Sequence, residues 1–383
     1  MKKVLIIHNK YREEGGEDLS VQNEIEFLKS EFNVKTLFFN NYINSKIKQS
    51  IYFILNKNLE SKKILKKSLR EFQPDVVYVH NTWFKASPAI FKVLSKSNIN
   101  TIVKIHNFRY SCTQSFLLRK HLKNDENCNA CGMENKNTIL FNKYFPESYL
   151  KSIFVIRYSK KFLKILKSQN FKIAVLTKFH RQFLNELGID NKKIYIFPNY
   201  LQNNTKIQRL NTKNYLVYAG RISKEKGIKE LIESFLKVKN KNMVLKIIGN
   251  GPYFDELKAL YSIEFIEFLG QLKNEEVHEI ISNSTAVVTA TKLFEGQPTL
   301  LCEASMFSVP SIFPSTGGIE EFFPQNYPLS FEQFNYEDLE NKLKLLKNDE
   351  SNKMIGRSNK HFLLEYLNKE KLISKFNLII NEK

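Results

Sequence analysis

Cysteine and long apolar stretches are both scarce in this sequence of 383 residues. No segment offers about 18 consecutive apolar residues, so we expect no membrane-spanning helix. The apolar run after Met1 ends at His8 and is too short for the hydrophobic region of a signal peptide. The few cysteines do not suggest a disulfide framework in a chain of this length. These absences together favour a cytoplasmic protein.

Acidic residues are scarce in the first half of the chain. Residues 1–200 hold 35 Lys and Arg against 16 Asp and Glu, whereas residues 201–383 hold 24 against 23. The net charge of +20 therefore belongs almost entirely to the first half. Basic surfaces attract nucleic acids, anionic membranes or acidic ligands, and they also keep a protein in solution. Composition alone leaves these alternatives open.

Two basic stretches in the first half combine positive charge with apolar residues. Ile43–Arg70 carries eight Lys and Arg against one Glu, and Tyr149–Lys172 carries seven and no acidic residue. Each would suit an amphipathic helix that lies on an anionic membrane. Each would also suit an ordinary crossover helix, with its apolar face in the core and its lysines in water.

Short apolar runs alternate with longer amphipathic stretches, which is typical of buried parallel strands joined by crossover helices. In the first half these runs are Val4–Ile7, Val34–Phe39, Val76–Val79, Ile102–Ile105, Ile173–Leu176 and Ile194–Phe197. In the second half they are Tyr215–Ala219, Val244–Ile248, Phe265–Leu269, Ala286–Thr289 and Ser311–Phe313. The pattern predicts an α/β protein with two Rossmann-like domains, residues 1–200 and 201–364. We expect a linker in Gln202–Lys213 and helix from about Lys353 to the end.

Each half has a glycine-bearing loop after its first strand, at Gly15 and Gly16 and at Gly220–Gly227. Glycines let the backbone approach a ligand closely, and a helix that follows presents free N–H groups to anions. Arg221 and Lys226 lie in the second loop, at the carboxyl end of a strand. Two cations and a helix dipole would stabilise charge on a departing diphosphate. The alternative is a loop with ordinary surface cations.

Two glutamates, Glu295 and Glu303, flank the turn Gly296-Gln297-Pro298 after the strand Ala286–Thr289. Proline is tolerated in a first helical turn, so we expect a helix to start there. Glu295 would then precede the helix and Glu303 would lie about two turns along it, both facing an interdomain cleft. Carboxylates suit the binding of sugar or ribose hydroxyls. The alternative is a pair of unrelated glutamates.

The motifs of the second half occur in one order between residues 215 and 322. They are Gly-Arg-x4-Lys-Gly at 220–227, Gly249-Asn250-Gly251-Pro252, Glu-Gly-x-Pro at 295–298 with Glu303, and Thr316-Gly317-Gly318 followed by Glu320 and Glu321. The first half adds Gly15-Gly16, Ile105-His106-Asn107 and Phe197-Pro198-Asn199, where Tyr200 replaces a more usual Gly. This set resembles glycosyltransferase family 4, the retaining enzymes with a GT-B fold. The resemblance implies two Rossmann-like domains facing across a cleft, with a helix at 365–383 that returns to the N-terminal domain.

The resemblance also implies roles for the matching residues. Arg221 and Lys226 would hold the donor diphosphate, Glu303 the nucleotide ribose and Glu295 the donor sugar. His106 would lie against the donor sugar, although a lone histidine at a strand end is usually structural. His106, Glu295, Arg221 and Lys226 are the candidate catalytic residues. Donor binding would further involve Gly15, Gly16, Gly220, Gly249, Gly251, Gly296, Gln297, Pro298, Thr299 and Leu300.

The implied reaction is retaining transfer of a sugar from a nucleotide-diphosphate sugar to a saccharide or lipid-linked acceptor. The expected setting is bacterial capsule, lipopolysaccharide or glycolipid synthesis. The leaving phosphate would help to deprotonate the acceptor, so Glu295 need not be a nucleophile like the carboxylate of a retaining glycosidase. Asp-x-Asp, a carboxylate pair that would hold a divalent ion, is absent. We therefore expect no cofactor and no divalent metal, with Arg221 and Lys226 in place of the ion.

Three cysteines, Cys112, Cys128 and Cys131, with His121 between them, would suit a zinc site. Only one Cys-x2-Cys pair is present, and three reduced thiols on a loop are the favoured alternative.

Other functions remain to be weighed against a transferase. A sugar-nucleotide epimerase or a phosphorylase would keep the fold and change the chemistry. A nucleic-acid-binding protein would use the basic half but would need an aromatic reading platform, and none is evident. We therefore expect a cytoplasmic enzyme that binds a nucleotide sugar and no nucleic acid. Docking of its basic half on the inner face of the cell membrane and ordinary solvent exposure of that half stay open as alternatives.

Overall fold

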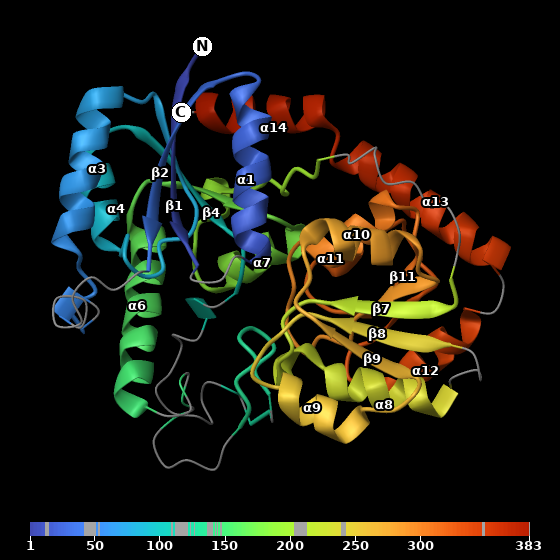
Figure 1. Ribbon diagram of the computed structural model, residues 1–383. Coiled ribbons are helices and arrows are strands. Elements are labelled where there is room, and N and C mark those ends of the chain that lie inside the picture. Colours follow the sequence, from blue (N-terminus) through green and yellow to red (C-terminus); the bar gives the residue numbers. More distant parts are fainter. Residues whose placement is uncertain are drawn as a thin grey trace. The chain divides into compact units, whose positions relative to one another are not determined.

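The computed structural model describes residues 1–11, 15–41, 51–52, 54–108, 110–111, 122, 124–125, 127–135, 141, 143, 145, 148–202, 213–238, 243–346 and 349–382. The chain divides into two compact units (Figure 1). Unit 1 consists of Met1–Leu201 and Leu367–Lys383, and unit 2 consists of Gln202–Tyr366. Within the described part of the chain, no helix has the length and apolar character needed to cross a membrane.

Unit 1 is built on a six-stranded sheet in the order β2-β1-β3-β4-β5-β6. Its strands are β1 (Lys3–Lys10), β2 (Asn33–Asn40), β3 (Val76–Val79), β4 (Asn100–Ile105), β5 (Lys172–Val175) and β6 (Ile194–Ile196). All neighbours are parallel, and Val4 of β1 pairs with Val34 and Val76 on its two sides. The central strands are apolar on both faces, as expected for a sheet that helices cover on both sides.

Helices cover both faces of this sheet. One face carries α3 (Leu59–Phe72), α4 (Ala89–Ser97), α6 (Tyr149–Ser168) and α7 (Lys178–Glu186), whose buried side chains share one core with β3 and β4. The other face carries α1 (Gly16–Lys29) and α14 (Lys369–Asn381). Phe376 of α14 contacts Phe32, Tyr78 and Phe197. The last helix of the chain therefore packs on unit 1, as expected.

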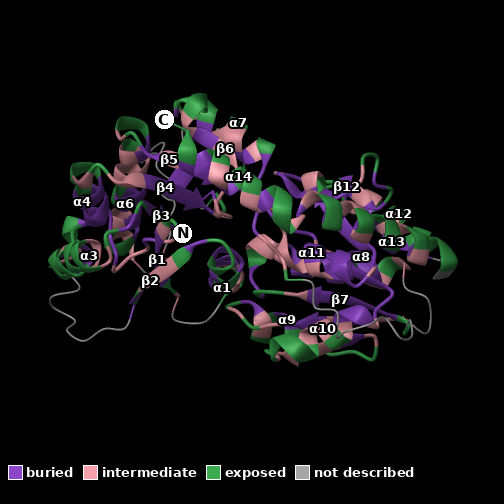
Figure 2. Cartoon of the chain, turned by 90° about the horizontal axis from the view of Figure 1, so that it is seen from above, coloured by how far each residue is buried: buried purple, intermediate pink, exposed green. Residues whose placement is uncertain are grey.

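Unit 2 is built on a second six-stranded parallel sheet, in the order β12-β11-β10-β7-β8-β9. Its strands are β7 (Tyr215–Ala219), β8 (Val244–Ile248), β9 (Ile266–Gly270), β10 (Ala286–Val288), β11 (Ser311–Ser315) and β12 (Ser330–Glu332). Figure 2 shows buried residues along the strands and exposed residues on the outer sides of the helices. The predicted fold class, α/β with two Rossmann-like domains, is confirmed.

The helices of unit 2 also form two layers (Figure 1). Helix α8 (Ile228–Val238) packs beside α12 (Tyr336–Leu345), with α9 (Phe254–Tyr261) in the same layer. Helix α11 (Thr299–Met306) contacts α10 (Asn274–Ser282) and α13 (Asp349–Tyr366) in the other layer. Short 3₁₀ turns occur at Lys224–Lys226 and Ile319–Phe322.

Each sheet has one pair of neighbouring strands from which the chain leaves toward opposite faces. In unit 1 this pair is β1 and β3, which lead into α1 and α4. In unit 2 it is β7 and β10, which lead into α8 and α11. Open α/β sheets bind their ligands outside the carboxyl ends of the strands at such a point. This rule predicts a ligand site beyond the ends of β1 and β3 in unit 1 and beyond the ends of β7 and β10 in unit 2.

Some expectations about individual elements need correction. Strand β12 was not predicted, because three residues at a sheet edge give too short a pattern. The helical stretch at the C-terminus is two helices, and the Asn368 side chain caps the second by accepting from Lys371 N. Helix α6 takes the ordinary crossover position, since Val155, Ile156 and Leu166 are buried. The expected linker lies outside the described residues except at its two ends.

Candidate functional site

In unit 2, the loops after β7 and β10 touch each other. Gly227 ends the first loop with φ of +66°, and a β-carbon there would lie 1.9 Å from the carbonyl oxygen of Ala290 in the second loop. Lys292 N donates to Glu225 O across the same contact, at 3.0 Å. Only glycine satisfies both the backbone angle and the close approach. The contact fixes the two loops at the point where the sheet rule places a ligand.

The side chains of these loops form an ion pair. Nζ of Lys226 lies 2.5 Å from Oε1 of Glu295, and Oγ1 of Thr291 donates to the same oxygen at 3.2 Å. The Lys226 and Glu295 side chains are 27 % and 26 % exposed, so a ligand can reach both. Gly318 N holds the Glu295 carbonyl at 2.8 Å, and Gly317 leaves no room for a β-carbon beside it. Three loops thus orient one carboxylate.

Two further glycines hold the loop that carries Arg221. A β-carbon on Gly249 would lie 2.0 Å from Gly220 O, and one on Gly251 would lie 2.2 Å from Ile222 O. The guanidinium of Arg221 is exposed and pairs with none of the residues that the structure describes. The glycines therefore set the path of the loop and leave a cation available at its surface.

Helix α11 begins at Thr299, directly after Pro298. Its first N–H groups have no partner within the helix and carry the positive end of the helix dipole. Glu303 lies just over one turn from this start, so the expectation of two turns is wrong. Its Oε1 is 3.4 Å from Nε2 of His278 on α10. The adjacent Cys302 is fully buried, and burial raises the pKa of its thiol.

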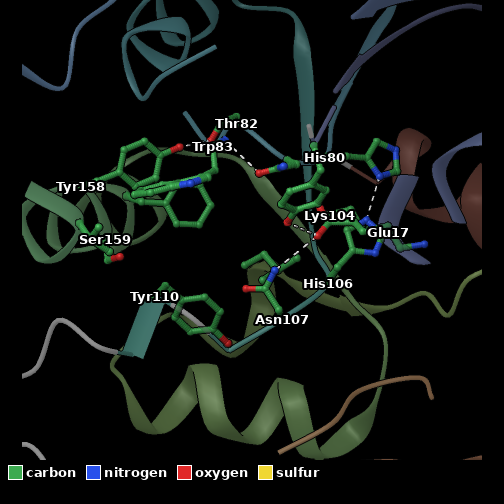
Figure 3. Close-up of a pocket in the computed structure, with 15 residues that line it drawn as sticks. Glu17, His80, Thr82, Trp83, Lys104, His106, Asn107, Tyr110, Tyr158 and Ser159 are labelled. Atoms are coloured by element: carbon green, nitrogen blue, oxygen red, sulfur yellow. Dashed lines mark hydrogen bonds between the residues drawn. The ribbon is translucent and has the colours of Figure 1, made fainter. Parts of the chain in front are cut away.

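Unit 1 has a pocket at the carboxyl ends of its strands (Figure 3). Its cavity volume of about 80 Å³ has room for several waters or part of a small ligand. Trp83, Tyr158 and Ser159 lie on one side, and His80, Lys104 and His106 lie on the other. The remaining lining residues are Tyr11, Glu17, Asn81, Thr82, Ile105, Asn107, Tyr110, Val155 and Phe162. The pocket combines aromatic surfaces with hydrogen-bonding groups.

Polar side chains under this pocket are almost all paired. Oε1 of Glu24 on α1 accepts from Lys104 Nζ at 2.6 Å and from Tyr78 OH at 3.0 Å. His80 and His106 share a hydrogen bond between Nδ1 and Nε2, at 3.0 Å. Burial is the largest cause that holds the pKa of both imidazoles well below 6.5, and neighbouring cationic groups add to it. Both rings are therefore neutral at physiological pH.

The glycine loop of unit 1 is organised by Asp18. Its carboxylate accepts from Gly15 N at 3.1 Å and lies 2.8 Å from Nε2 of His8. Burial acts to raise the pKa of Asp18, but the hydrogen bonds from His8, Gly15 and Tyr11 outweigh it and lower the pKa. Asp18 caps the helix that starts at Gly16, and it occupies the anion-attracting end of that helix.

The zinc hypothesis involves residues of which only some are described. Cys112 and His121 lie outside the described residues. Cys128 and Cys131 lie in a tight turn, in which Cys128 N donates to Met133 O at 2.9 Å. Among the described residues, no group of three or more His, Cys, Asp or Glu is placed to hold a metal ion.

Comparisons with known proteins agree with the motifs of unit 2. Residues 202–362 match the family model described as Glycosyl transferases group 1. The sulfoquinovosyl transferase SQD2 of Arabidopsis thaliana is 26 % identical over 151 residues, covering 38 % of this chain and 29 % of that protein. The amylovoran biosynthesis glycosyltransferase AmsD of Erwinia amylovora is 26 % identical over 157 residues, covering 37 % and 42 %. The chain thus spans less than half the length of these two curated relatives.

Solved structures extend the likeness to the whole chain. Sucrose-phosphate synthase from Thermosynechococcus elongatus aligns with a TM-score of 0.70 at 12 % identity, covering 99 % of this chain and 98 % of that one. Anabaena HepE in complex with UDP and glucose aligns with a TM-score of 0.68 at 10 % identity, covering 100 % of both chains. At these identities the likeness over the whole chain is one of fold, and the match to the family model concerns residues 202–362.

The structure distributes the predicted site residues over the two units. Gly15, Gly16 and His106 belong to unit 1. The remaining candidates belong to unit 2, in the segments that follow β7, β8 and β10 and in the first turns of α11. The structure brings the side chains of Lys226 and Glu295 together, whereas Glu303 lies beside His278 of α10. Sequence reasoning missed Thr291, His278, Glu24, His80 and Lys104. A signal existed for Lys104, since a lysine inside an apolar strand requires a buried counterion.

Proposed function

We propose that this chain is a retaining glycosyltransferase that moves a sugar from a nucleotide-diphosphate sugar to a saccharide or lipid-linked acceptor. The observation that carries the proposal is the Lys226–Glu295 pair, which lies where β7 and β10 end, next to the first turn of α11. A donor sugar needs both a place for its diphosphate and an acceptor of sugar hydroxyl hydrogen bonds. This part of unit 2 offers both.

The cations of unit 2 suit the leaving diphosphate. Lys226 and Arg221 are accessible, and the N-terminus of α11 adds free N–H groups and the positive end of a dipole. Charge that builds up on the leaving group in the transition state would be stabilised by these fixed groups. In this proposal they perform the task without a divalent metal and without a cofactor.

The carboxylates of unit 2 suit the rest of the donor. Glu295 would accept hydrogen bonds from hydroxyls of the transferred sugar, and Glu303 from hydroxyls of the nucleotide ribose. Oε1 of Glu295 lies 2.5 Å from Nζ of Lys226, so this carboxylate is held in place beside a cation. In this proposal Glu295 is a binding group and not a nucleophile, and transfer takes place on one face with the leaving phosphate as the base.

The pocket of unit 1 suits a saccharide acceptor. The faces of Trp83 and Tyr158 offer apolar surface to the C–H groups of a sugar ring, and His106, Asn107 and Glu17 offer hydrogen bonds to its hydroxyls. A hydrophobic wall with a few placed polar groups is the usual make-up of a small-molecule site.

The surface of α3 suits an anionic membrane. Lys63, Lys66, Lys67 and Arg70 are exposed, and Ile64 beside them is 44 % exposed. Lys161 of α6 donates to Asn56 O at 2.9 Å, which places the two basic stretches side by side. Docking there would bring the protein to a lipid-linked acceptor at the inner face of the cell membrane, in the assembly of a surface polysaccharide or glycolipid.

A ligand-stabilisation screen tests the donor site first. Nucleoside diphosphates and their sugars would be added in turn, because a ligand that binds only the folded state raises its stability by mass action. At least one uridine or guanosine diphosphate sugar should raise the melting temperature of the wild type and of Lys237→Met, but not of Lys226→Met. Lys237 is a matched control because it also forms a short ion pair, with Glu340 at 2.7 Å.

Turnover with the donor so identified then tests the chemistry. The transferred sugar should keep its anomeric configuration in the product, and chelating agents should leave the rate unchanged. Formation of an epimerised nucleotide sugar without any acceptor would instead show an epimerase. Salt-sensitive binding of oligonucleotides without donor binding would overturn the proposal altogether.

A further inference from the structure

A chain of buried polar side chains runs from α1 to the pocket of unit 1. Lys104 and Tyr78 both donate to Oε1 of Glu24. Oε2 of the same carboxylate lies 3.8 Å from Nε2 of His80. Nδ1 of His80 lies 3.0 Å from Nε2 of His106, and His106 lines the pocket (Figure 3). The three side chains form a continuous path from a carboxylate to the pocket wall.

One gap in this path is informative. Oε2 of Glu24 and Nε2 of His80 are both buried and have no hydrogen-bond partner, and they face each other. A buried polar atom without a partner costs about 1–3 kcal/mol. A movement of roughly 1 Å would close the gap to hydrogen-bond distance. We therefore expect Oε2 of Glu24 and Nε2 of His80 to form a hydrogen bond with each other.

The direction of the protons along the path follows from the carboxylate. Two donors on Oε1 favour the ionised form of Glu24, and an ionised carboxylate can only accept. His80 must then carry its proton on Nε2, which leaves Nδ1 as an acceptor. His106 must carry its proton on Nε2 to donate to it. Nδ1 of His106 is left without a proton.

Burial acts in two ways on these groups. It raises the pKa of Glu24, and the positive charge of Lys104 opposes that shift, together with the hydrogen bonds from Lys104 and Tyr78. It lowers the pKa of His80 and His106, so each ring holds a single proton near pH 7. A neutral imidazole has one donor and one acceptor nitrogen, and the other groups of the path decide which is which.

We propose that Glu24 and His80 are positioning residues that fix His106 as the Nε2–H tautomer, so that its Nδ1 accepts a hydrogen bond from a substrate hydroxyl. The identity of that hydroxyl as a sugar hydroxyl rests on the proposed function. The tautomer does not, because it is set within unit 1 before any ligand binds. Without the path, the two tautomers of His106 would compete, and one of them would present a donor to the pocket.

Nitrogen NMR of ¹⁵N-histidine-labelled protein at pH 7 tests the tautomer directly. The chain has seven histidines, and His106→Asn identifies the resonances of His106 by their loss. In the wild type without ligand, the proton should be on Nε2 of His106 and Nδ1 should have the shift of an unprotonated nitrogen. A proton on Nδ1 would overturn the proposal, and this result needs no variant of Glu24 or His80.

A variant that reverses the path supplies the second test. In Glu24→Gln/Lys104→Met the amide would donate to Nε2 of His80, and the apolar Met avoids an unpaired buried cation. His80 would then donate from Nδ1, and His106 should change to the Nδ1–H tautomer. Glu26→Gln is the matched control on the same helix, since Glu26 is exposed and Lys29 is its one partner in the part of the chain that the structure describes. It should leave the tautomer unchanged, and an unchanged tautomer in the double variant would overturn the proposal.

Kinetics separate this inference from the proposed function. The double variant should lose about ten- to a hundredfold in kcat/KM for sugar transfer. The reason is that Nδ1–H of His106 could no longer accept a hydrogen bond from the substrate hydroxyl. If the wild type carries the Nε2–H tautomer of His106 but transfers no sugar, the proposed function is rejected and the inference about the path stands. If the wild type transfers sugar but carries the proton on Nδ1 of His106, the inference about the path is rejected and the proposed function stands.

Discussion

Lys226 and Glu295 come from the loops after two adjacent parallel strands, and their side chains meet at 2.5 Å. They are 69 positions apart in the sequence, so only the sheet brings them together. An ion pair with both members about a quarter exposed contributes little to stability, about 1 kcal/mol or less. Its position at the ends of β7 and β10 fits the proposed donor site, in which a ligand would contact both side chains.

Removing the lysine should affect transfer far more than folding. Lys226→Met should lower kcat by about 100- to 1,000-fold, the usual cost of losing one group that stabilises transition-state charge. The free energy of unfolding should change by about 1 kcal/mol or less. Transfer rates and urea unfolding measure the two effects, with Lys237→Met as the control for loss of a short ion pair. Equal loss of activity in both variants would contradict the assignment.

Two glycines with nearly the same backbone angle should respond differently to a methyl group. Gly227 and Gly270 have φ of +66° and +68°. A β-carbon on Gly227 meets Ala290 O at 1.9 Å, whereas one on Gly270 meets nothing within 4 Å. Gly270→Ala should cost about 1 kcal/mol from its backbone angle alone. Gly227→Ala should cost about 3 kcal/mol or more, because the loops must also separate.

Circular dichroism during urea unfolding measures both glycine variants. The fluorescence of Trp83, the single tryptophan of the chain, reports on unit 1 and serves as an internal reference. Gly227→Ala should shift the transition of unit 2 and leave the Trp83 transition in place. Equal costs for the two substitutions would show that the loop contact is not tight.

The sequence predicts most of the sheet architecture because buried parallel strands leave a strong signal. Val4–Ile7 and Val76–Val79 are fully buried, and each is an unbroken apolar run bounded by polar residues. Strand β12 and the break at Leu367 carry no comparable signal. The first is three residues long, and the second depends on a single asparagine cap.

The candidate site is predictable only in part, for a physical reason. Arg221, Lys226 and Glu295 lie in loops with a recognisable spacing, so their positions can be inferred from the pattern. Contacts such as Glu24 with His80 join residues 56 positions apart across a sheet, and no local pattern encodes them. Glu24 looks in the sequence like a surface residue of an amphipathic helix, yet it is 0 % exposed.

Acid should destabilise unit 1 through His180. Burial lowers the pKa of this imidazole from 6.5 to about 3, and Tyr110 OH lies 2.5 Å from its Nε2. Between these two values the unfolded chain binds a proton that the folded chain does not, so stability falls as the pH falls from about 6.5 to about 3. The slope from this one group should reach about 1.4 kcal/mol per pH unit.

Urea unfolding followed by Trp83 fluorescence at a series of pH values checks the role of His180. His180→Gln should remove part of the slope, since glutamine keeps a polar group beside Tyr110 but takes up no proton. Tyr110→Phe should retain the slope, because burial rather than the hydroxyl is the cause of the shift. A slope that is the same in the wild type and in His180→Gln would contradict this account.

Membrane docking should depend on the exposed lysines of α3. The triple variant Lys63→Gln/Lys66→Gln/Lys67→Gln removes three positive charges from a helix whose buried residues are only Ser61 and Leu65. Each lysine near an anionic surface contributes about 1 kcal/mol, so affinity for phosphatidylglycerol vesicles should fall by about 100-fold. Cosedimentation measures this, and the wild type should also lose affinity as salt is added.

The control for docking lies in unit 2, where Lys258, Lys273 and Lys344 are also exposed lysines. Replacing these three by glutamine makes the same change in net charge, so a purely non-specific attraction would fall by the same amount. A local docking surface predicts that only the α3 variant loses affinity. It also predicts that Ile64→Ser weakens binding further, since this exposed side chain would insert among the lipid headgroups. Equal losses in the two triple variants would leave net charge as the sole cause and remove α3 as the docking surface.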